Sequence, residues 1–243
     1  MKNLFLLSAL GLVAGACQKK EVAPAADPTW LKLEIPTQYE RDQVYAVTGD
    51  LDRTLLVSTT TGLYVTADQG KTWQRTRTVA EAVWGLLPRR DTIFALTSYR
   101  ADSLNNKLTA VYADYFTADQ GKTWAYTAPR YSYEEYRTIR QPFGQVSAGG
   151  NTYRVQDNWV PYGTGNSKVQ RASDLVRTDA AGRQQVLRLP ARTLLNNLSL
   201  DATNRLYVAA SARQFDEATG EPTAVAAEKK NTAVLYVSRQ PLP

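Results

Sequence analysis

The chain has 243 residues, of which 43% are apolar and 21% are charged, and its formal net charge is +6. A chain of this size and composition can bury a full core, as one domain or as two small ones, and is not largely disordered. It contains no histidine and one cysteine. These counts exclude histidine-based general base catalysis, Ser-His-Asp and Cys-His nucleophiles, histidine-ligated metals, an intramolecular disulfide and a cysteine-rich zinc site. We expect no cofactor and no bound metal.

Residues 1–17 have the order of a secretory signal. Lys2 supplies a positive charge, Leu4–Val13 is an apolar run too short to span a bilayer, and three small residues precede Cys17. This segment resembles the bacterial lipobox, in which cleavage of the signal leaves a lipidated cysteine at the new N-terminus. The resemblance implies an exported protein of the bacterial cell envelope, anchored to a membrane through Cys17, with residues 18–28 as a tether. An ordinary signal peptide is the alternative.

The strongest internal signal is an eight-residue sequence that occurs twice with identical letters. The copies are Thr66–Trp73 and Thr117–Trp124, which lie 51 residues apart. Periods of this size are typical of solenoids, propellers and other repeat arrays. Each copy follows an apolar, strand-like run and leads into a segment that begins with Trp, and a polar turn between two such runs predicts a β-hairpin.

Turn chemistry accounts for the conspicuous aspartates of the two copies. An aspartate at the start of a turn accepts hydrogen bonds from backbone N–H groups further on, and a following glycine supplies a positive φ. The eight residues resemble the Asp-box (BNR) repeat, Ser/Thr-x-Asp-x-Gly-x-Thr-Trp, of sialidases, sortilin-type receptors and a photosystem II assembly factor. In that family the repeat is a structural hairpin of a β-propeller blade. The resemblance thus implies structural roles for Thr66, Asp68, Gly70, Thr72, Trp73, Thr117, Asp119, Gly121, Thr123 and Trp124.

Four modules are visible when degenerate copies of the hairpin are included, near Leu175 and Leu235. The last module lacks its fourth strand, whereas residues 29–35 carry a spare Thr-Trp pair and alternate apolar with polar residues. We therefore expect an all-β fold with one domain over residues 29–243. It is a small four-bladed β-propeller whose ring is closed by the N-terminal strand, which removes exposed sheet edges. Five blades, with residues 126–165 arranged differently, are the alternative.

The turn signals divide each module into four strands. The expected strands are 44–48, 54–59, 63–67 and 73–77 in the first blade; 82–87, 92–98, 110–116 and 124–127 in the second; 145–148, 152–156, 170–177 and 185–189 in the third; and 195–200, 205–210, 233–237 and 29–35 in the fourth.

The two ends of the expected blades differ in loop length, because successive turns of an antiparallel meander lie at opposite ends. The end with the aspartate turns, here called the Asp-turn end, has short turns throughout. The opposite end, here called the insertion end, carries the segments 99–109, 128–136, 157–168 and 211–232. Long loops on a rigid scaffold often carry function.

Planar side chains gather in the insertions: Arg100, Arg130, Tyr131, Tyr133, Tyr136, Trp159 and Tyr162. Aromatic residues and arginine dominate binding hot spots, so these residues are candidates for contact with a protein or a carbohydrate. The alternative is that they pack the loops down onto the scaffold.

We expect a non-catalytic, membrane-anchored module that binds a protein or glycan partner. A sialidase-like exo-glycosidase is the alternative, and the family resemblance would then require an arginine triad that grips a carboxylate, with an acid and a nucleophile. Arginines are available at positions 89, 90, 100, 137 and 140, but Glu134, Glu135 and Asp157 are not paired by spacing. An assembly factor for an envelope complex is a weaker alternative, which rests on the repeat alone. The scattered basic residues argue against a nucleic-acid partner.

Overall fold

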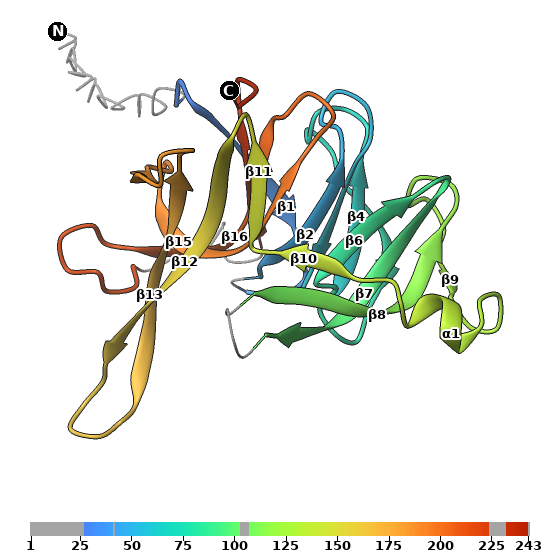
Figure 1. The fold of residues 1–243 in the computed structure, drawn as a ribbon, viewed down its shortest axis with the longest axis horizontal. Helices are drawn as coiled ribbons and strands as arrows, with labels where there is room; N and C mark the ends of the chain where they lie inside the picture. The colour runs from blue at the N-terminus through green and yellow to red at the C-terminus, as the bar shows by residue number, and fades with distance from the viewer. Residues whose placement is uncertain (1–26, 41, 103–106, 224–231, 243) are drawn as a thin grey trace, which may run out of the picture.

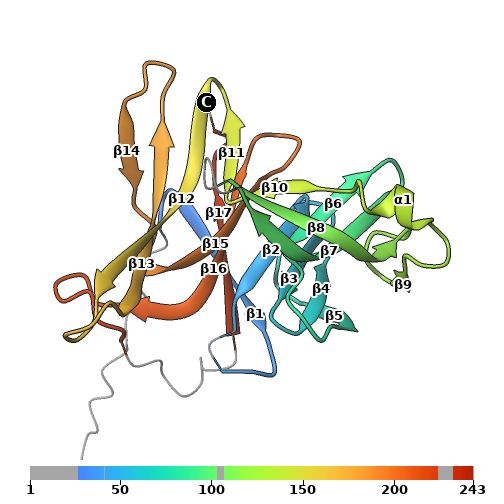
Figure 2. The ribbon, with the colours of Figure 1, turned by 60° about the horizontal axis from the view of Figure 1, so that its bottom comes forward.

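The computed structural model describes residues 27–40, 42–102, 107–223 and 232–242. Within these residues, seventeen β-strands and one short helix form four antiparallel sheets, which are arranged as the blades of a β-propeller (Figures 1 and 2). The predicted all-β, four-bladed fold is confirmed, and the five-bladed alternative is wrong. The expected signal, the lipidation site Cys17 and residues 18–26 of the expected tether lie outside the described residues.

Blades 1 and 2 come first along the chain. Blade 1 consists of β2 (Val44–Gly49), β3 (Leu55–Thr59), β4 (Gly62–Thr66) and β5 (Gln74–Thr78). Blade 2 consists of β6 (Gly85–Arg89), β7 (Thr92–Ala101) and β8 (Leu108–Thr117), with both β9 (Ala125–Tyr126) and β10 (Gln141–Phe143) paired to β8.

Blades 3 and 4 complete the ring. Blade 3 consists of β11 (Gln145–Ala148), β12 (Asn151–Pro161), β13 (Lys168–Thr178) and β14 (Gln184–Leu187). Blade 4 consists of β15 (Arg192–Leu200), β16 (Leu206–Phe215), β17 (Thr232–Ser238) and the N-terminal strand β1 (Trp30–Pro36).

The strands differ from the expected ones mainly at the insertion end. There β7, β8, β12, β13 and β16 continue for several residues into segments expected to be loops, and β10 and the helix α1 (Tyr133–Tyr136) were not predicted. In β7, β12 and β13 the reason is that backbone pairing continues beyond the point where side chains are buried, whereas the added residues of β16 include the buried Ser211, Ala212 and Phe215. Outside the core the alternation of apolar and polar residues is lost, and with it the sequence signal for a strand.

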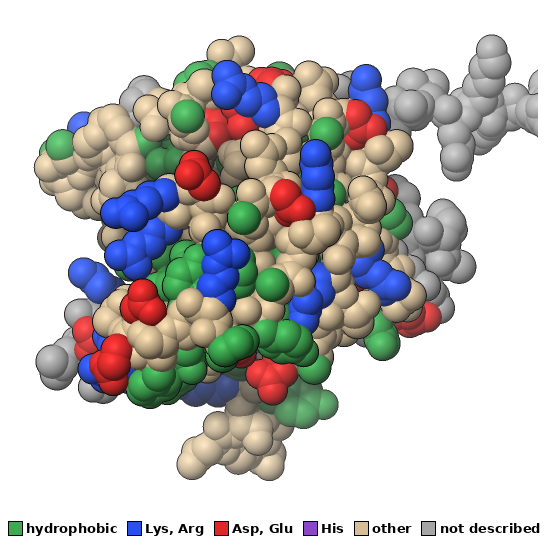
Figure 3. All heavy atoms as spheres, turned by 90° about the vertical axis from the view of Figure 1, so that its right-hand side faces the viewer, with side chains coloured by type: hydrophobic (Ala, Val, Ile, Leu, Met, Phe, Trp, Pro, Cys, Tyr) green, Lys and Arg blue, Asp and Glu red, His purple; other side chains and the backbone are tan. Residues whose placement is uncertain are grey.

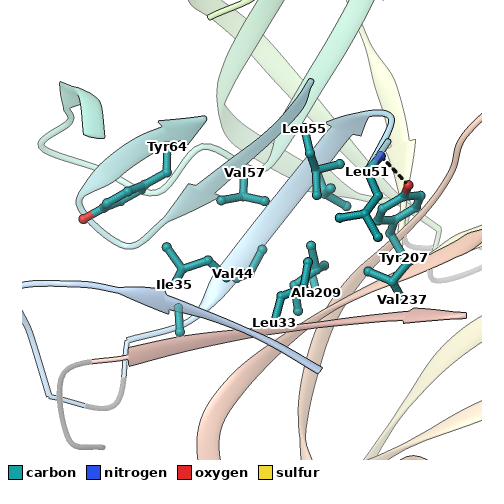
Figure 4. Close-up of a cluster of buried hydrophobic side chains, with 13 residues drawn as sticks. Leu33, Ile35, Val44, Leu51, Leu55, Val57, Tyr64, Tyr207, Ala209 and Val237 are labelled. Atoms are coloured by element: carbon teal, nitrogen blue, oxygen red, sulfur yellow. Dashed lines mark hydrogen bonds between the residues drawn. The ribbon is translucent and has the colours of Figure 1, made fainter. Parts of the chain in front are cut away.

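The N-terminal strand closes the ring, as the sequence predicts. β1 runs antiparallel to β17 over seven paired positions, from Trp30 opposite Ser238 to Pro36 opposite Thr232. Leu33 and Ile35 of β1 are buried in a cluster shared by blades 4 and 1, which Figure 4 shows in close-up. Burial of such aliphatic side chains is the main stabilising contribution, at about 25 cal/mol per Å² of apolar surface.

Three tryptophans of the repeat pattern each reach the preceding blade. Trp73 packs against the cluster shared by blades 4 and 1. The indole N–H of Trp124 donates to the hydroxyl of Thr76 in blade 1 at 3.1 Å, and that of Trp30 donates to the carbonyl of Arg188, just beyond blade 3, at 2.9 Å. The outer strand of each of these blades is thereby fixed to its neighbour.

The seam between blades 2 and 3 is built differently. The degenerate hairpin of blade 3 has no tryptophan, and among the described residues no hydrophobic cluster spans the two blades. Instead, the connection from β9 to β11 covers the core of blade 2. Its residues Ile139 and Phe143 are buried against Phe94 and Leu96.

One buried amide joins the blades where this connection arrives. In β15, Asn197 Nδ2 donates to the carbonyls of Tyr45 at 3.0 Å and Trp84 at 3.3 Å, and its Oδ1 accepts from the backbone N–H of Gly144 at 2.9 Å. These partners belong to blade 1, to the start of blade 2 and to the link between β10 and β11. A single side chain of blade 4 therefore holds the other blades at their meeting point.

Candidate functional site

The aspartates of the two identical turns direct their carboxylates into the turns themselves. Asp68 accepts hydrogen bonds from the backbone N–H of Thr72 at 2.9 Å, from the hydroxyl of Thr72 at 2.6 Å and from the hydroxyl of Thr66 at 2.8 Å. Asp119 makes the same three bonds to Thr123 and Thr117.

These bonds determine the protonation state of both aspartates. The bonds from Thr72 and Thr123, first of all those from their hydroxyls, lower the pKa of Asp68 and of Asp119 to about 2. A general acid must carry a proton near the working pH, and neither carboxyl does so at neutral pH. The geometry is that of turn formers and not of catalytic acids.

The glycines of the two turns lie directly on the neighbouring blade. Gly70 and Gly121 have φ values of +80° and +86°, and a Cβ at either position would approach Leu33 of β1 to 2.8 Å or Leu56 of β3 to 2.4 Å. A side chain at either position would therefore clash as well as strain the backbone. The glycines of the repeat thus allow neighbouring blades to pack closely against each other at the Asp-turn end.

The structure divides the predicted binding residues into groups, and it places Arg130 and Tyr131 beside Phe94 and Phe116, near the Asp-turn end of blade 2 and not at the insertion end. Tyr131 and Tyr136 are partly buried against the core of blade 2, where the ring of Tyr131 lies 5.3 Å from that of Phe94. The guanidinium of Arg130 lies 4.9 Å from the ring centre of Phe116. For Arg130, Tyr131 and Tyr136 the geometry therefore favours the packing role over contact with a partner.

Arg100 and Tyr133 instead line a small pocket with residues that the sequence analysis did not join to them. The pocket has a volume of about 120 Å³. Its walls are Arg100 from β7, Val111 and Tyr112 from β8, Tyr133 from α1, and Arg137 and Arg140 from the link between α1 and β10. We call it the Arg–Tyr pocket.

The charges of the Arg–Tyr pocket are only partly balanced. Arg137 forms an ion pair with Glu134, with 2.5 Å between Nε and Oε2. The guanidinium of Arg100 donates to the phenol oxygen of Tyr112 at 2.9 Å, and that of Arg140 has no hydrogen bond or ion pair with any described residue. Figure 3 views this side of the molecule and shows Lys and Arg side chains interspersed with hydrophobic ones.

The remaining two candidates, Trp159 and Tyr162, lie on an arm formed by the outer part of β12 and β13. Figures 1 and 2 show this arm on the opposite side of the molecule from α1. Trp159 and Tyr162 are 54% and 67% exposed. The base of the arm is held to blade 4, where Arg171 pairs with Glu221 at 2.5 Å and donates to the carbonyl of Gly220 at 3.0 Å.

The residues that the sequence analysis missed were hidden for different reasons. Tyr112 falls inside an expected strand, where nothing in the alternation of residues singles it out, but it has a φ of +58° and an exposed side chain. Arg137 and Arg140 were noted only as available arginines. Their spacing next to Tyr133 was the one signal that could have placed them with it.

Other chemistry is limited within the described part of the chain. It contains no group of three or more His, Cys, Asp or Glu side chains that could hold a metal ion. In the same residues, no helix is long and apolar enough to cross a membrane. A second cavity of about 290 Å³ between blades 3 and 4 has mixed charge, with Asp174, Arg188, Arg192 and Glu217 in its walls.

No protein-family model matches the sequence, and no curated protein matches it significantly. Among solved structures, a luciferin-regenerating enzyme is similar at 12% identity and a TM-score of 0.39, over 86% of this chain and 95% of that one. A nidogen/laminin complex is similar at 11% identity and a TM-score of 0.31, over 86% of this chain and 100% of the other. BamB from Moraxella catarrhalis follows at 12% identity and a TM-score of 0.20, over 82% and 75%. Similarities this low carry no functional argument.

Proposed function

We propose that this protein is an exported, lipid-anchored and non-catalytic binding module that presents the insertion end of its propeller to a protein or glycan partner. The observation that carries the proposal is the Arg–Tyr pocket, where three guanidinium groups meet two tyrosines on a rigid scaffold. Arginine and tyrosine are enriched at binding hot spots, and such sites are usually largely pre-formed. The exposed arm, on the opposite side of the molecule from α1, offers a second contact surface.

A sialidase-like hydrolase is the second candidate, because three arginines do converge in one pocket. Glycoside hydrolysis normally also requires an acid and a nucleophile or base, most often a pair of carboxylates on either side of the scissile bond. None of the described residues that line the Arg–Tyr pocket is a carboxylate, and nearby Glu134 is engaged by Arg137. The geometry therefore favours binding over hydrolysis. An assembly role for an envelope complex is one form that such binding could take.

The membrane anchor rests on the lipobox-like sequence at Cys17. More than one acyl chain on this cysteine would give stable anchoring, which a single short chain does not. We expect Cys17→Ser to release the protein from the membrane fraction at high salt. A variant that still fractionates with membranes would contradict the anchor.

The binding function is tested with a glycan array and a pull-down on the mature chain. We expect Tyr133→Ala or Trp159→Ala to abolish binding without a change in melting temperature. Tyr126→Ala is the matched control, because Tyr126 is 64% exposed on β9 but lies outside the pocket and the arm. Hydrolysis of a sialoside would overturn the non-catalytic assignment, and binding that survives both variants would overturn the choice of surface.

A further inference from the structure

We propose that the Arg–Tyr pocket binds the anionic group of an acidic sugar, a carboxylate or a sulfate, with Tyr112 and Tyr133 contacting the sugar ring. This inference rests on the proposed function and names the ligand chemistry of its main site. Three features of the pocket support it: the unbalanced charge, the backbone conformation at Tyr112, and the pocket's size.

The first feature is the charge. Three guanidinium groups line the pocket, and only that of Arg137 has a carboxylate partner among the described residues. Arg100 is bonded to a neutral phenol, and Arg140 has no partner in the described chain. Guanidinium groups bind planar or tetrahedral oxyanions through paired N–H donors, and such charge-assisted bonds are about twice as strong as neutral ones. An anionic ligand would supply the missing partner.

The second feature is the backbone at Tyr112, which has a φ of +58° within a β-strand. This left-handed conformation is costly for a bulky side chain. The phenol of Tyr112 lies beside Arg100, to which it is hydrogen-bonded, and the register shift between β7 and β8 lies two residues further on, at Asp114. Strained residues of this kind concentrate at ligand sites.

The third feature is the size and the rim of the pocket. A volume of about 120 Å³ holds one anionic group and little more. The remainder of a ligand would then lie on the exposed rings of Tyr112 and Tyr133, which are 37% and 57% accessible. A sugar offers flat C–H faces to such rings and hydroxyls to their phenol groups, whereas an extended acidic peptide needs a longer groove. The observations therefore favour a sugar.

The test is a calorimetric titration of the mature chain with trigalacturonate and with a sulfated galactose oligosaccharide. The methyl ester of trigalacturonate, which keeps the rings but loses the charge, is the ligand control. We expect at least one of the two acidic sugars to bind and the ester to bind at least about tenfold more weakly. The two acidic probes distinguish a carboxylate from a sulfate as the group recognised.

The protein variants assign the binding to the pocket. Arg140→Gln removes a guanidinium that holds no other described residue, so we expect an unchanged melting temperature and about tenfold weaker binding. Arg89→Gln is the matched control, because Arg89 is exposed at the Asp-turn end of β6. Its binding should stay within about twofold of the unmodified chain, since surface charges at a distance are screened.

Three results would overturn the inference. The first is the failure of both acidic sugars to bind, and the second is binding that Arg140→Gln leaves unchanged. The third is an Arg140-dependent affinity for hexaglutamate in the absence of sugar binding, which would assign the pocket to acidic peptides. The proposed function is judged separately. If the pocket does not bind acidic sugars but Trp159→Ala still abolishes binding of a partner on the glycan array or in the pull-down, the proposal of binding at the insertion end stands.

Discussion

The two ends of the propeller use polar side chains in opposite ways. At the Asp-turn end, the carboxylates of Asp68 and Asp119 are fully engaged within their own turns. At the insertion end, the guanidinium of Arg140 has no partner in the described chain, and Trp159 and Tyr162 are largely exposed. The comparison teaches that the most conspicuous motif of the sequence builds the scaffold, whereas the groups that we propose for binding lie in segments without a motif.

The same contrast extends to the cluster of charges between blades 4 and 1. Arg205 at the turn between β15 and β16 pairs with Asp50, Asp52 and Asp201 at 2.7 to 2.8 Å. The phenol of Tyr207 donates to Asp201 at 2.9 Å and accepts from the backbone N–H of Leu51 at 3.0 Å. Three carboxylates thus surround one guanidinium at the Asp-turn end. In the Arg–Tyr pocket, three guanidinium groups have one carboxylate nearby, that of Glu134, which pairs with Arg137.

The largest expected effect concerns the scaffold on which both ends depend. Deletion of residues 29–35 removes most of β1 and exposes the edge of β17 and part of the cluster around Ile35. We expect the loss of cooperative unfolding, measured by circular dichroism during heating. A deletion variant with an unchanged melting transition would contradict closure of the ring by this strand.

A smaller loss of stability is expected when the side-chain amide of Asn197, which joins the blades, is removed. Asn197→Leu leaves the carbonyls of Tyr45 and Trp84 and the N–H of Gly144 without this partner. We expect the free energy of unfolding in urea to fall by about 3 kcal/mol, because buried polar groups are left unpaired. Asn196→Leu is the control, since within the described residues its amide bonds only to Val44 of blade 1 and to the preceding Gln43. An equal loss for both variants would contradict the special role of Asn197.

Acid should weaken the Asp-turn end. Burial alone would raise the pKa of Asp201, but hydrogen bonds from Thr203, Arg205 and Tyr207 outweigh it and lower the pKa to about 2, from 3.8. A lowered pKa stabilises the fold above the unfolded value and loses that contribution as the pH falls through the folded one. We expect the melting temperature to fall between pH 4 and pH 2, and less steeply in Asp201→Asn. An unaltered slope in that variant would contradict the assignment.

The sequence predicted the fold well because the fold depends on repeated local chemistry. The aspartate turns, the alternating strands and the spare Thr-Trp pair at residues 29–35 specified four blades and their closure. Each is a short-range signal with a physical cause. The connection from β9 to β11, which covers blade 2 in place of a neighbouring blade, has no repeat to mark it and was missed.

For the candidate binding residues, the sequence did not predict which would line a common pocket and which would pack on the scaffold. Arg100 and Tyr133 belong to the pocket, while Tyr131 and Tyr136 pack on the core of blade 2 and Trp159 lies on the arm. Whether an aromatic side chain in an insertion packs or remains exposed depends on tertiary contacts, which a single sequence does not encode locally.

One measurement tests directly whether the Asp-turn end serves to stabilise the fold and the insertion end serves to bind a ligand. Asp119→Ala and Arg140→Gln are compared for melting temperature and for trigalacturonate affinity in the same buffer. We expect Asp119→Ala to lose about 1 kcal/mol of stability and keep its affinity, and Arg140→Gln to keep its stability and lose affinity about tenfold. The reverse pattern, or equal losses in both variants, would contradict the division of roles.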